Sequence, residues 1–500
     1  METVPAALAR AALEFGRHPA LVDPHVRRWD FAGLHDEVVT VARALIASGI
    51  EPGDRVAIWA PNSARWMLSA LGVLYAGGTL VPVNTRYTAV EAADVIGRSG
   101  ARGLIVTGPF LGTDRLASLR ESGAELPPFV LALPEWDAFR ERSGEVPRDA
   151  AEERASTVRP DDVSDILYTS GTTGRSKGAM SAHRQSLGVA REWARIGGLD
   201  IRDRYLVVNP FFHSFGLKAG ILACLVSGAT VVPQAVFDVP RTLDLIETER
   251  ISVLPGPPTL YIGLLDHPVR GGRDLRSLRL AVTGAATVPP VLVERIRDEL
   301  GFATVLTAYG LTEAVVATMC RPGDDTRTVA FTSGRAAAGF EVRIAGKDGE
   351  VLLRGPNVML GYLDDPAATA EAIDPDGWLH TGDVGTLDDA GNLTITDRLK
   401  DMYVCGGFNV YPAEVERALA ALPGVSEAAV VGVPDPRLGE VGRAYVVARP
   451  GHELTAEQVL GYCRERLAGY KVPRSVVFPD GLPHNASGKV LKYRLREVTT

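Results

Sequence analysis

The feature of this sequence that most constrains its fold is a run of glycine and hydroxyl residues directly after a short apolar stretch. It reads DILYTSGTTGRSKGAMSA over residues 165–182. The apolar residues 166–168 predict a buried strand, and the glycines behind it let backbone amides turn inward as an anion-binding nest. Two glycines, four hydroxyl side chains and one ammonium are therefore expected to bind phosphate: Thr169, Ser170, Gly171, Thr172, Thr173, Gly174 and Lys177.

Other interpretations of this run stay open on its composition alone. In a P-loop NTPase, glycine precedes the lysine and serine or threonine follows it, whereas here Ser176 precedes Lys177 and Gly178 follows. That class, which would release ADP and phosphate, is therefore disfavoured. Glycine- and serine-rich segments are also common in plain surface loops. A non-catalytic nucleotide-binding or scaffold protein would bind ATP without turning it over.

Composition and charge indicate a folded protein and disfavour nucleic-acid binding, export and membrane insertion. The 500 residues are 46% apolar and 23% charged, which is ordinary for a folded chain of two or more domains. A net charge of −8 creates no basic field, so nucleic acid is not an expected partner. The N-terminal residues read as an amphipathic helix without the apolar core of an export signal, and the apolar runs are too short to cross a bilayer.

The four cysteines are far apart in the sequence and match neither a disulfide framework nor a zinc site. We therefore expect a reduced, cytoplasmic protein that is not inserted in a membrane. Its oligomeric state, monomer or homodimer, stays open.

Helical and strand-like patterns alternate over the first 310 residues, which is typical of an α/β fold with parallel strands covered by helices. Two doubly wound subdomains are the simplest arrangement, with ligands beyond the carboxyl ends of the strands. The charged segment 136–162 predicts a surface connection. We expect helices over 31–48, 64–76, 89–99, 216–228, 239–250, 257–268 and 289–300. We expect strands over 55–60, 79–84, 204–210, 229–234, 251–256, 278–286 and 303–310.

The pattern changes after Gly334. Short strands separated by turns, over 340–346, 349–355 and 391–398, predict a small β-barrel-like unit. The last hundred residues are enough for a small α+β domain. We expect an N-terminal domain over 1–399 and a C-terminal domain over 400–500, with the hinge within 398–401.

Six motifs in register resemble the adenylate-forming superfamily of acyl-CoA synthetases, luciferases and peptide-synthetase adenylation domains. They are LYTSGTTGRSKG at 167, GAATVP at 284, AYGLTE at 308, GWLHTGD at 377, DRLKDMYVCGGFNVYPAEVE at 397 and NASGK at 485. Ser176 stands where the family usually has proline, which should alter loop stiffness more than chemistry. The segments NPFFHSFGLKAGILACL, LPGPPTLYIGLLDHP, VLTAYGLTEA and EVLLRGPNVMLGYLDD look like the actinobacterial ligases that activate the bicyclic propionate left late in steroid-ring degradation.

The resemblance implies a reaction in two halves. A carboxylate attacks the α-phosphate of ATP, giving an acyl-adenylate and pyrophosphate, and the thiol of CoA then displaces AMP. ATP, Mg²⁺ and CoA are therefore expected. A ligase for fatty or aromatic acids, or an acyl-AMP ligase serving a carrier protein, is the alternative. Only eleven residues follow Lys489, which favours free CoA as the acceptor.

Four residues carry the expected catalytic roles. By resemblance, Lys489 holds the carboxylate and α-phosphate together, and Thr312 contacts the α-phosphate. Glu313 is the expected Mg²⁺ ligand, since such sites combine one or two carboxylates with phosphates and water; a helix-start carboxylate is its alternative. His213 is the expected gate between acyl and thiol channels, and a buried core histidine is its alternative.

Further residues are expected around the nucleotide and at the domain junction. Asp383 has the paired acceptors that ribose hydroxyls need. By resemblance, the adenine is framed by Gly284, Ala285, Ala286 and Tyr309, with Gly310 also near the nucleotide. Arg398 is expected to contact the ribose or a phosphate, and Lys400 is the expected hinge. Gly406 and Gly407 are expected to line the passage for pantetheine. Cys405 is expected to be a packing residue. Lys218 is either an exposed lysine or part of the surroundings that accept an oxygenated ring.

Overall fold

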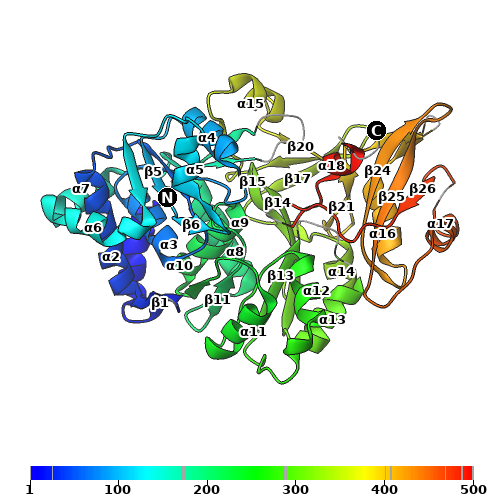
Figure 1. Ribbon diagram of the computed structural model, residues 1–500, viewed down its shortest axis with the longest axis horizontal. Helices are drawn as coiled ribbons and strands as arrows, with labels where there is room; N and C mark the ends of the chain where they lie inside the picture. Colours follow the sequence, from blue (N-terminus) through cyan, green and yellow to red (C-terminus); the bar gives the residue numbers. More distant parts are fainter. Residues whose placement is uncertain are drawn as a thin grey trace.

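The computed structural model describes residues 2–24, 26–169, 176–284, 288, 290–399, 401–405, 408–467, 469–485 and 488–497. Two mixed sheets form the larger part of the molecule and a small antiparallel sheet follows them. The C-terminal residues, orange to red in Figure 1, form a further sheet at one end. The predicted α/β class, with a large N-terminal part and a smaller C-terminal one, is confirmed.

The first sheet contains seven strands, of which the sequence predicted the three at 55–60, 79–84 and 166–168 and missed those at 103–106 and 129–132. The seven strands are β3 (Arg55–Trp59), β4 (Thr79–Pro82), β5 (Gly103–Val106), β8 (Phe129–Ala132), β9 (Val163–Tyr168), β10 (Gly178–Ala182) and β19 (Gly361–Tyr362). The order is β19–β10–β9–β4–β3–β5–β8, with β10 and β19 antiparallel at one edge. Every residue of β4 and β5 is buried, as expected for parallel strands with helices on both faces.

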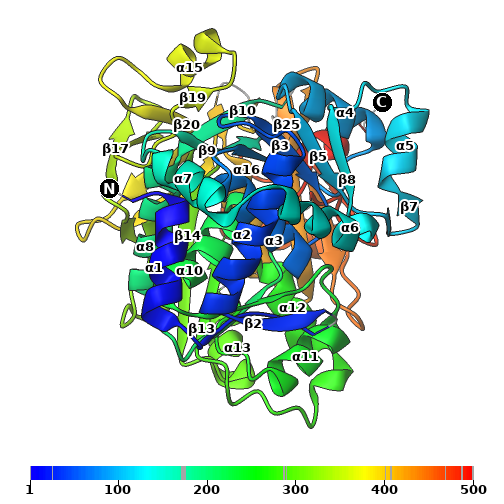
Figure 2. The same ribbon diagram turned by 90° about the vertical axis from the view of Figure 1, so that its left-hand side faces the viewer.

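Helices cover both faces of this sheet. On one face, α4 (Ala89–Arg98) and α5 (Arg115–Glu121) share a buried cluster with alternate residues of the central strands. On the other, α1 (Val4–Phe15), α2 (Phe31–Ala47) and α3 (Ala64–Tyr75) pack in the main core together with the second sheet. The last two helices therefore lie between the sheets, in the middle of Figure 2.

The second sheet is built from two runs of four strands. They are β11 (Arg204–Val207), β12 (Thr230–Pro233), β1 (Pro19–Asp23) and β2 (Arg27–Asp30), then β13 (Leu280–Gly284), β14 (Thr304–Leu311), β15 (Ala314–Met319) and β16 (Arg335–Ala336). Val253 joins the runs by bridging Tyr205 and Leu280. The strand predicted over 251–256 is confirmed in its place between β11 and β13, since the amides of Leu254 and Gly256 donate to the carbonyls of Leu280 and Val282 at 3.0 Å. Its regular pairing is limited to Val253, and Pro255 offers no N–H.

Helices accompany the second sheet roughly as predicted. They are α8 (His183–Gly197), α9 (Ser214–Gly216), η3 (Leu217–Leu222), α10 (Ala223–Ser227), α11 (Val239–Thr248), α12 (Pro258–Asp266), η4 (Pro268–Arg270), α13 (Pro290–Leu300) and α14 (Thr326–Phe331). The helix expected over 216–228 begins as the π-helical η3 and continues as α10.

The charged segment 136–162 is not the irregular connection that we predicted. It forms three helical elements, α6 (Trp136–Glu141), η2 (Arg142–Glu145) and α7 (Arg148–Thr157). The turn η1 (Leu133–Glu135) directly precedes them, and a small hairpin of β6 (Pro109–Phe110) and β7 (Thr113–Asp114) lies further upstream. Trp136 and Phe139 lie three residues apart and are both buried. Arg140 donates to the buried carboxylate of Glu37 in α2 at 3.0 Å, so part of the charge that suggested a loop is paired with the large domain.

The remaining elements form two smaller units. The predicted β-barrel-like unit is a four-stranded antiparallel sheet of β17 (Glu341–Ala345), β18 (Glu350–Arg354), β20 (Leu379–Leu387) and β21 (Leu393–Arg398), with α15 (Pro366–Ala372) between β19 and β20. The C-terminal unit contains β22 (Tyr403–Cys405), β23 (Phe408–Val410), α16 (Pro412–Ala420), β24 (Val425–Asp435), β25 (Gly439–Ala448), α17 (Ala456–Arg464), β26 (Ser475–Val477) and α18 (Lys492–Glu497). Its buried cluster is drawn from residues 403–495.

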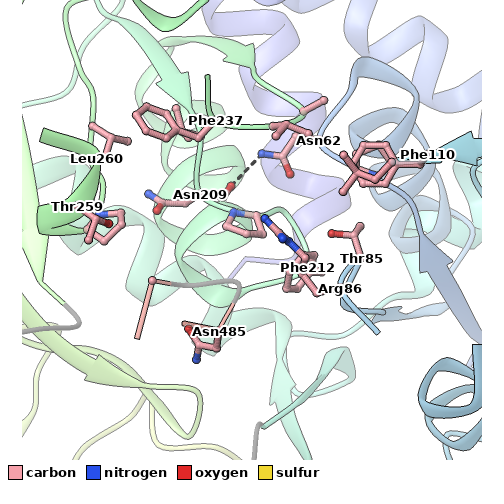
Figure 3. Close-up of a pocket in the computed structure, with 18 residues that line it drawn as sticks. Asn62, Thr85, Arg86, Phe110, Asn209, Phe212, Phe237, Thr259, Leu260 and Asn485 are labelled. Carbon is pink, nitrogen blue, oxygen red and sulfur yellow. Dashed lines mark hydrogen bonds between the residues drawn. The ribbon is translucent and has the colours of Figure 1, made fainter. Parts of the chain in front are cut away.

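One side chain ties the loops of the two sheets together. Asn62, in the loop after β3, donates to the carbonyl of Asn209 at 3.0 Å and accepts from the amide of Phe211 at 2.7 Å (Figure 3). It is 6% exposed, so these bonds form away from water. The segment after β11 is therefore fixed against the first sheet at the carboxyl ends of both sets of strands.

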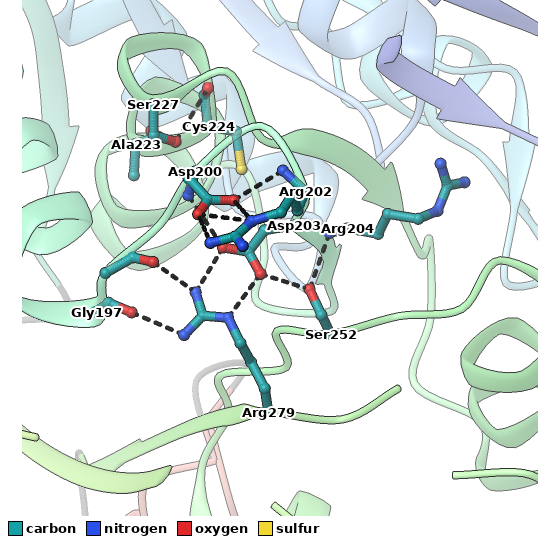
Figure 4. Close-up of polar contacts among 11 residues, drawn as sticks. Gly197, Asp200, Arg202, Asp203, Arg204, Ala223, Cys224, Ser227, Ser252 and Arg279 are labelled. Carbon is teal, nitrogen blue, oxygen red and sulfur yellow. Dashed lines mark hydrogen bonds and ion pairs between the residues drawn. The ribbon is translucent and has the colours of Figure 1, made fainter. Parts of the chain in front are cut away.

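Polar contacts also join the opposite, amino-terminal ends of the second sheet (Figure 4). Arg279, just before β13, donates from Nε to Asp203 at 2.8 Å and reaches the carbonyls of Gly197 and Gly198 at 3.1 and 2.9 Å. Asp203 is 3% exposed and also accepts from Ser252 at 2.8 Å. One guanidinium thus fixes the ends of three segments around a buried carboxylate.

We predict that Arg279→Met lowers the free energy of unfolding by about 2–4 kcal/mol, because it leaves the buried carboxylate of Asp203 without its cation. Urea unfolding followed by circular dichroism measures this change. The matched control is Arg276→Met, whose guanidinium makes an exposed pair with Asp274, and its stability should equal that of the native chain. An Arg279→Met chain as stable as this control contradicts the assignment.

Candidate active site

The phosphate-binding run lies between β9 and β10, as the sequence predicted. Thr169 and Lys177 close its two ends, since the amide of Thr169 donates to the carbonyl of Lys177 at 2.9 Å. Arg98, at the end of α4, donates to the carbonyl of Ser176 at 2.7 Å, and its guanidinium lies 5.5 Å from the centre of the Tyr168 ring. The predicted phosphate ligands Ser170, Gly171, Thr172, Thr173 and Gly174 lie outside the described residues.

Tyr362 brings the lysine of this run next to the expected metal ligand. The ammonium of Lys177 lies 5.1 Å from the centre of the Tyr362 ring, and the Tyr362 hydroxyl donates to Glu313 Oε1 at 2.7 Å. Burial and the neighbouring Glu313 carboxylate raise the pKa of the Tyr362 phenol well above its usual value, so the phenol keeps its proton. Sequence analysis assigned no role to Tyr362, although it lies in the quoted segment EVLLRGPNVMLGYLDD.

Thr312 and Glu313 form the turn of a hairpin between β14 and β15, in which Leu311 pairs with Ala314. The helix-start interpretation of Glu313 is therefore wrong. The ladder shifts between Tyr309 and Leu311, so Gly310 occupies an irregular position. A Cβ at Gly310 would lie 2.5 Å from the amide of Val316, and only glycine fits there without a shift.

The expected adenine residues Gly284 and Tyr309 lie on the paired strands β13 and β14, and the expected ribose residue Asp383 lies on β20 of another sheet. Gly284 ends β13, and a Cβ there would lie 2.5 Å from the carbonyl of Ala308 on β14. The hydroxyl of Tyr309 donates to Asp383 Oδ2 at 2.6 Å, and Asp383 is 3% exposed. Arg398 is the cross-strand partner of Asp383 on β21. Its side chain lies outside the described residues, as do Ala285 and Ala286.

His213 lies in the loop after β11 that Asn62 holds. Its Nδ1 accepts from the amide of Phe215 at 3.2 Å, which leaves the proton of a neutral ring on Nε2. Burial lowers the pKa of the imidazole to about 4, so the ring is uncharged at neutral pH. The Phe215 ring makes an edge contact with Trp193 of α8, with ring centres 5.3 Å apart. His213 is therefore held as a rigid, neutral side chain.

A cavity of about 260 Å³ lies beside this loop (Figure 3). Its walls come from segments that follow the carboxyl ends of parallel strands in both sheets, as the doubly wound arrangement predicted. Its apolar walls include Phe110, Phe212 and Phe237, and Arg86 is exposed beside them. The full lining is Pro61, Asn62, Thr85, Arg86, Phe110, Leu111, Val208, Asn209, Pro210, Phe212, Ala235, Val236, Phe237, Pro257, Thr259, Leu260, Asn485 and Gly488.

The loop that carries Lys489 lines the same cavity from the C-terminal unit. Asn485 and Lys489 close it, with the amide of Asn485 donating to the carbonyl of Lys489 at 2.8 Å and the amide of Lys489 donating to Asn485 Oδ1 at 2.8 Å. A Cβ at Gly488 would lie 3.2 Å from Pro257 of the large domain. His484, before the loop, bonds Glu427 at 2.5 Å, and this bond raises the pKa of its imidazole.

The expected hinge and pantetheine residues Lys400, Gly406 and Gly407 lie outside the described residues. Cys405 is buried and unpaired, which agrees with a packing role. Within the described ranges no three His, Cys, Asp or Glu side chains cluster as a metal site. Glu313 is the carboxylate that could hold Mg²⁺ together with substrate phosphates and water.

The exposed-lysine interpretation of Lys218 is wrong, because its side chain is buried against Asp165. Sequence reasoning missed Arg98, Asn62 and Tyr362. Arg98 and Asn62 donate to backbone carbonyls of segments that are distant in the sequence, and no local sequence pattern predicts such a contact. In the part of the chain that the structure describes, no helix is long and apolar enough to span a bilayer.

Comparison with known proteins agrees with this geometry. The model of the family described as AMP-binding enzyme matches residues 8–363, and that of the AMP-binding enzyme C-terminal domain matches residues 414–489. A solved structure of the anthranilate CoA ligase AuaEII with anthranoyl-AMP is 26% identical, with a TM-score of 0.90, and the match covers 100% of this chain and 97% of that one.

Two curated relatives are more similar in sequence. Both are named 3-[(3aS,4S,7aS)-7a-methyl-1,5-dioxo-octahydro-1H-inden-4-yl]propanoyl:CoA ligase. The one from Rhodococcus jostii is 58% identical, over 99% of this chain and 98% of its own. The one from Mycobacterium tuberculosis is 59% identical, over 100% of this chain and 99% of its own. The resemblance seen in the six motifs is confirmed, and the chain belongs to the AMP-binding enzyme family, among its acyl-CoA ligases.

Proposed function

We propose that this chain is an AMP-forming ligase that joins CoA to a bicyclic propionate of the indane-dione type produced in steroid-ring degradation. The observation that carries the proposal is the identity of 58–59% over the whole chain to two ligases named for that acid. The geometry supports the chemistry, since Tyr362 contacts both Lys177 and Glu313, and Tyr309 bonds Asp383.

In the first half-reaction two anions must meet, so catalysis depends on positioning and on neutralising charge. Lys177 would hold the β- and γ-phosphates, Lys489 the carboxylate and α-phosphate, and Thr312 the α-phosphate. Asp383 would accept from the ribose hydroxyls. The carboxylate oxygen attacks the α-phosphorus and pyrophosphate leaves with the electron pair of the broken P–O bond.

Mg²⁺ would be held by Glu313 and the phosphates, and it supplies charge neutralisation at the leaving pyrophosphate. The hydroxyl of Tyr362 fixes one oxygen of this carboxylate, and the ring of the same residue supports Lys177. The side chain of Tyr362 would thus orient both Lys177 and the carboxylate that holds Mg²⁺, and so the two positive charges that face the phosphates of ATP.

In the second half-reaction the sulfur of CoA attacks the acyl carbon and AMP leaves. We propose that the cavity beside the Phe212 and Asn485 loops admits the thin thiol arm, with the charge of Arg86 facing the phosphates of CoA. Residues 400–500 would rotate about Lys400, which withdraws the Lys489 loop and brings Gly406 and Gly407 to the passage. The unpaired cysteines fit a cytoplasmic enzyme.

The test is ATP-, Mg²⁺- and CoA-dependent release of AMP across a panel of acids, from acetate through long-chain and aromatic acids to the bicyclic propionate. A strong preference for the bicyclic acid is expected. A preference for linear or aromatic acids keeps the ligase chemistry and removes this substrate. Adenylate formation without transfer to free CoA would instead point to a carrier protein as the acceptor.

We predict that Lys489→Ala abolishes adenylate formation but leaves thioester formation from supplied acyl-adenylate within a few fold of native. The reason is that its ammonium bridges the two anions only while they react in the first half. Pyrophosphate exchange and thioester assays measure the two halves separately. Lys347→Ala, an exposed lysine in the turn after β17, is the control. Equal loss of both halves contradicts the role.

We predict that Tyr362→Phe slows acid-dependent pyrophosphate exchange about tenfold, because a hydrogen bond to a charged carboxylate contributes about 1.5 kcal/mol or more. Tyr362→Leu should slow it further, since Lys177 then also loses the ring. Tyr462→Phe removes a hydroxyl that bonds the Ala421 carbonyl, far from the site, and should leave exchange unchanged. A Tyr362→Phe rate within twofold of native removes the phenol from the mechanism.

A further inference from the structure

Lys218 is a buried lysine that the proposed mechanism does not use. It is 1% exposed, and its ammonium lies 3.0 Å from Asp165 Oδ1 and donates to Ser181 Oγ at 2.8 Å. Asp165 is 2% exposed. The two side chains therefore form an ion pair in the interior of the large domain.

Serine hydroxyls satisfy the other oxygen of the carboxylate. Asp165 Oδ2 lies 2.7 Å from the hydroxyl oxygens of both Ser164 and Ser186, and both serines are buried. His183 is the neighbouring titratable side chain, and burial lowers its pKa to about 4, so it is neutral. The charge of Asp165 is thus balanced by Lys218, and the network joins β9, β10, α8 and η3.

Stability alone does not explain this pair. A buried ion pair is often no more stabilising than apolar side chains of the same volume, because both charges must leave water, and its best-attested use is to fix a register. Here the register is that of the phosphate-binding hairpin. Asp165 and Ser181 are direct cross-strand partners on β9 and β10, and the Lys218 ammonium forms an ion pair with the first and donates to the second.

The lysine also belongs to the segment that carries His213. The amide of Leu217 donates to the carbonyl of His213 at 3.0 Å, and Lys218 follows in the first turn of η3. That turn is π-helical, a form that is rare in proteins and frequent at functional sites. One ammonium therefore connects the strands that flank the phosphate run to the loop expected at the acyl group.

We propose that Lys218 is a positioning residue that sets the separation between the phosphate-binding run and the His213 loop while the acyl-adenylate forms. The inference rests on the proposed function. Asp165 and Ser181 each lie four residues from the ends of the run, about 13 Å along a strand, so Lys218 acts through the strands and touches no reacting atom. A displacement of about 1 Å between reacting groups can slow a reaction about a hundredfold.

The test compares binding with turnover. In Lys218→Met, ATP alone and acid alone should bind within about twofold of native, while the single-turnover rate of adenylate formation falls about tenfold to a hundredfold. Arg279→Met is the matched control, because it also removes the cation from a buried carboxylate but at the opposite ends of the strands. Its adenylation rate should stay native at temperatures where it is folded.

The double variant Asp165→Leu/Lys218→Met separates positioning from stability. Replacing both charges by apolar groups should restore the unfolding midpoint but not the rate. Recovery of the rate together with stability would overturn the proposal, as would a native rate in Lys218→Met.

If these chains do not fold, Ser181→Ala removes one bond of the ammonium and keeps the ion pair. A fall in its adenylation rate of more than twofold supports the proposal, and a smaller one overturns it. A native chain that forms no adenylate with any acid of the panel would instead refute the proposed function itself.

Discussion

The site depends on the antiparallel pairing of β9 with β10, because a run of glycines and small hydroxyl residues takes its position from its two ends. In this register Ala179 of β10 pairs with Tyr362 of β19, so the strand that leaves the phosphate run is also the one that meets the phenol above Lys177. A slip by one residue would turn each of these side chains to the other face of the sheet. The charge arrangement of the site is therefore a consequence of strand register.

Two glycines make the nucleotide side of the site possible. At Gly284 and Gly310 a Cβ would come within 2.5 Å of backbone atoms of neighbouring strands. The main chains of β13, β14 and β15 therefore pack closely at this point. Tyr309 of β14 reaches Asp383 from there, and the Thr312–Glu313 turn joins β14 to β15. Close approach of main chains at these two glycines therefore sets where Tyr309 and the Thr312–Glu313 turn lie.

Much of this could be predicted from the sequence, since the alternation of apolar strands and amphipathic helices is a local signal. Short motifs also pointed to Thr312, Glu313 and Asp383, whose roles stay predictions, and the structure places the first two in one turn and bonds the third to Tyr309. Contacts between distant segments were not. The charged segment 136–157 contains no local pattern that predicts the burial of Trp136 and Phe139. The ion-pair partner of Lys218 is Asp165, which lies 53 residues away in the sequence. The apolar run 251–256 pairs regularly with its neighbouring strands only at Val253, because proline at 255 has no N–H to donate.

The neutral ring of His213 has a consequence for how the enzyme responds to acidity. Because its pKa is about 4, this imidazole changes charge only in solutions more acidic than those in which most enzymes work. The ring therefore stays uncharged near neutrality, and its contacts do not change with pH in that range. A rise in the rate of thioester formation toward alkaline pH would then point to ionisation of the attacking thiol rather than of this imidazole.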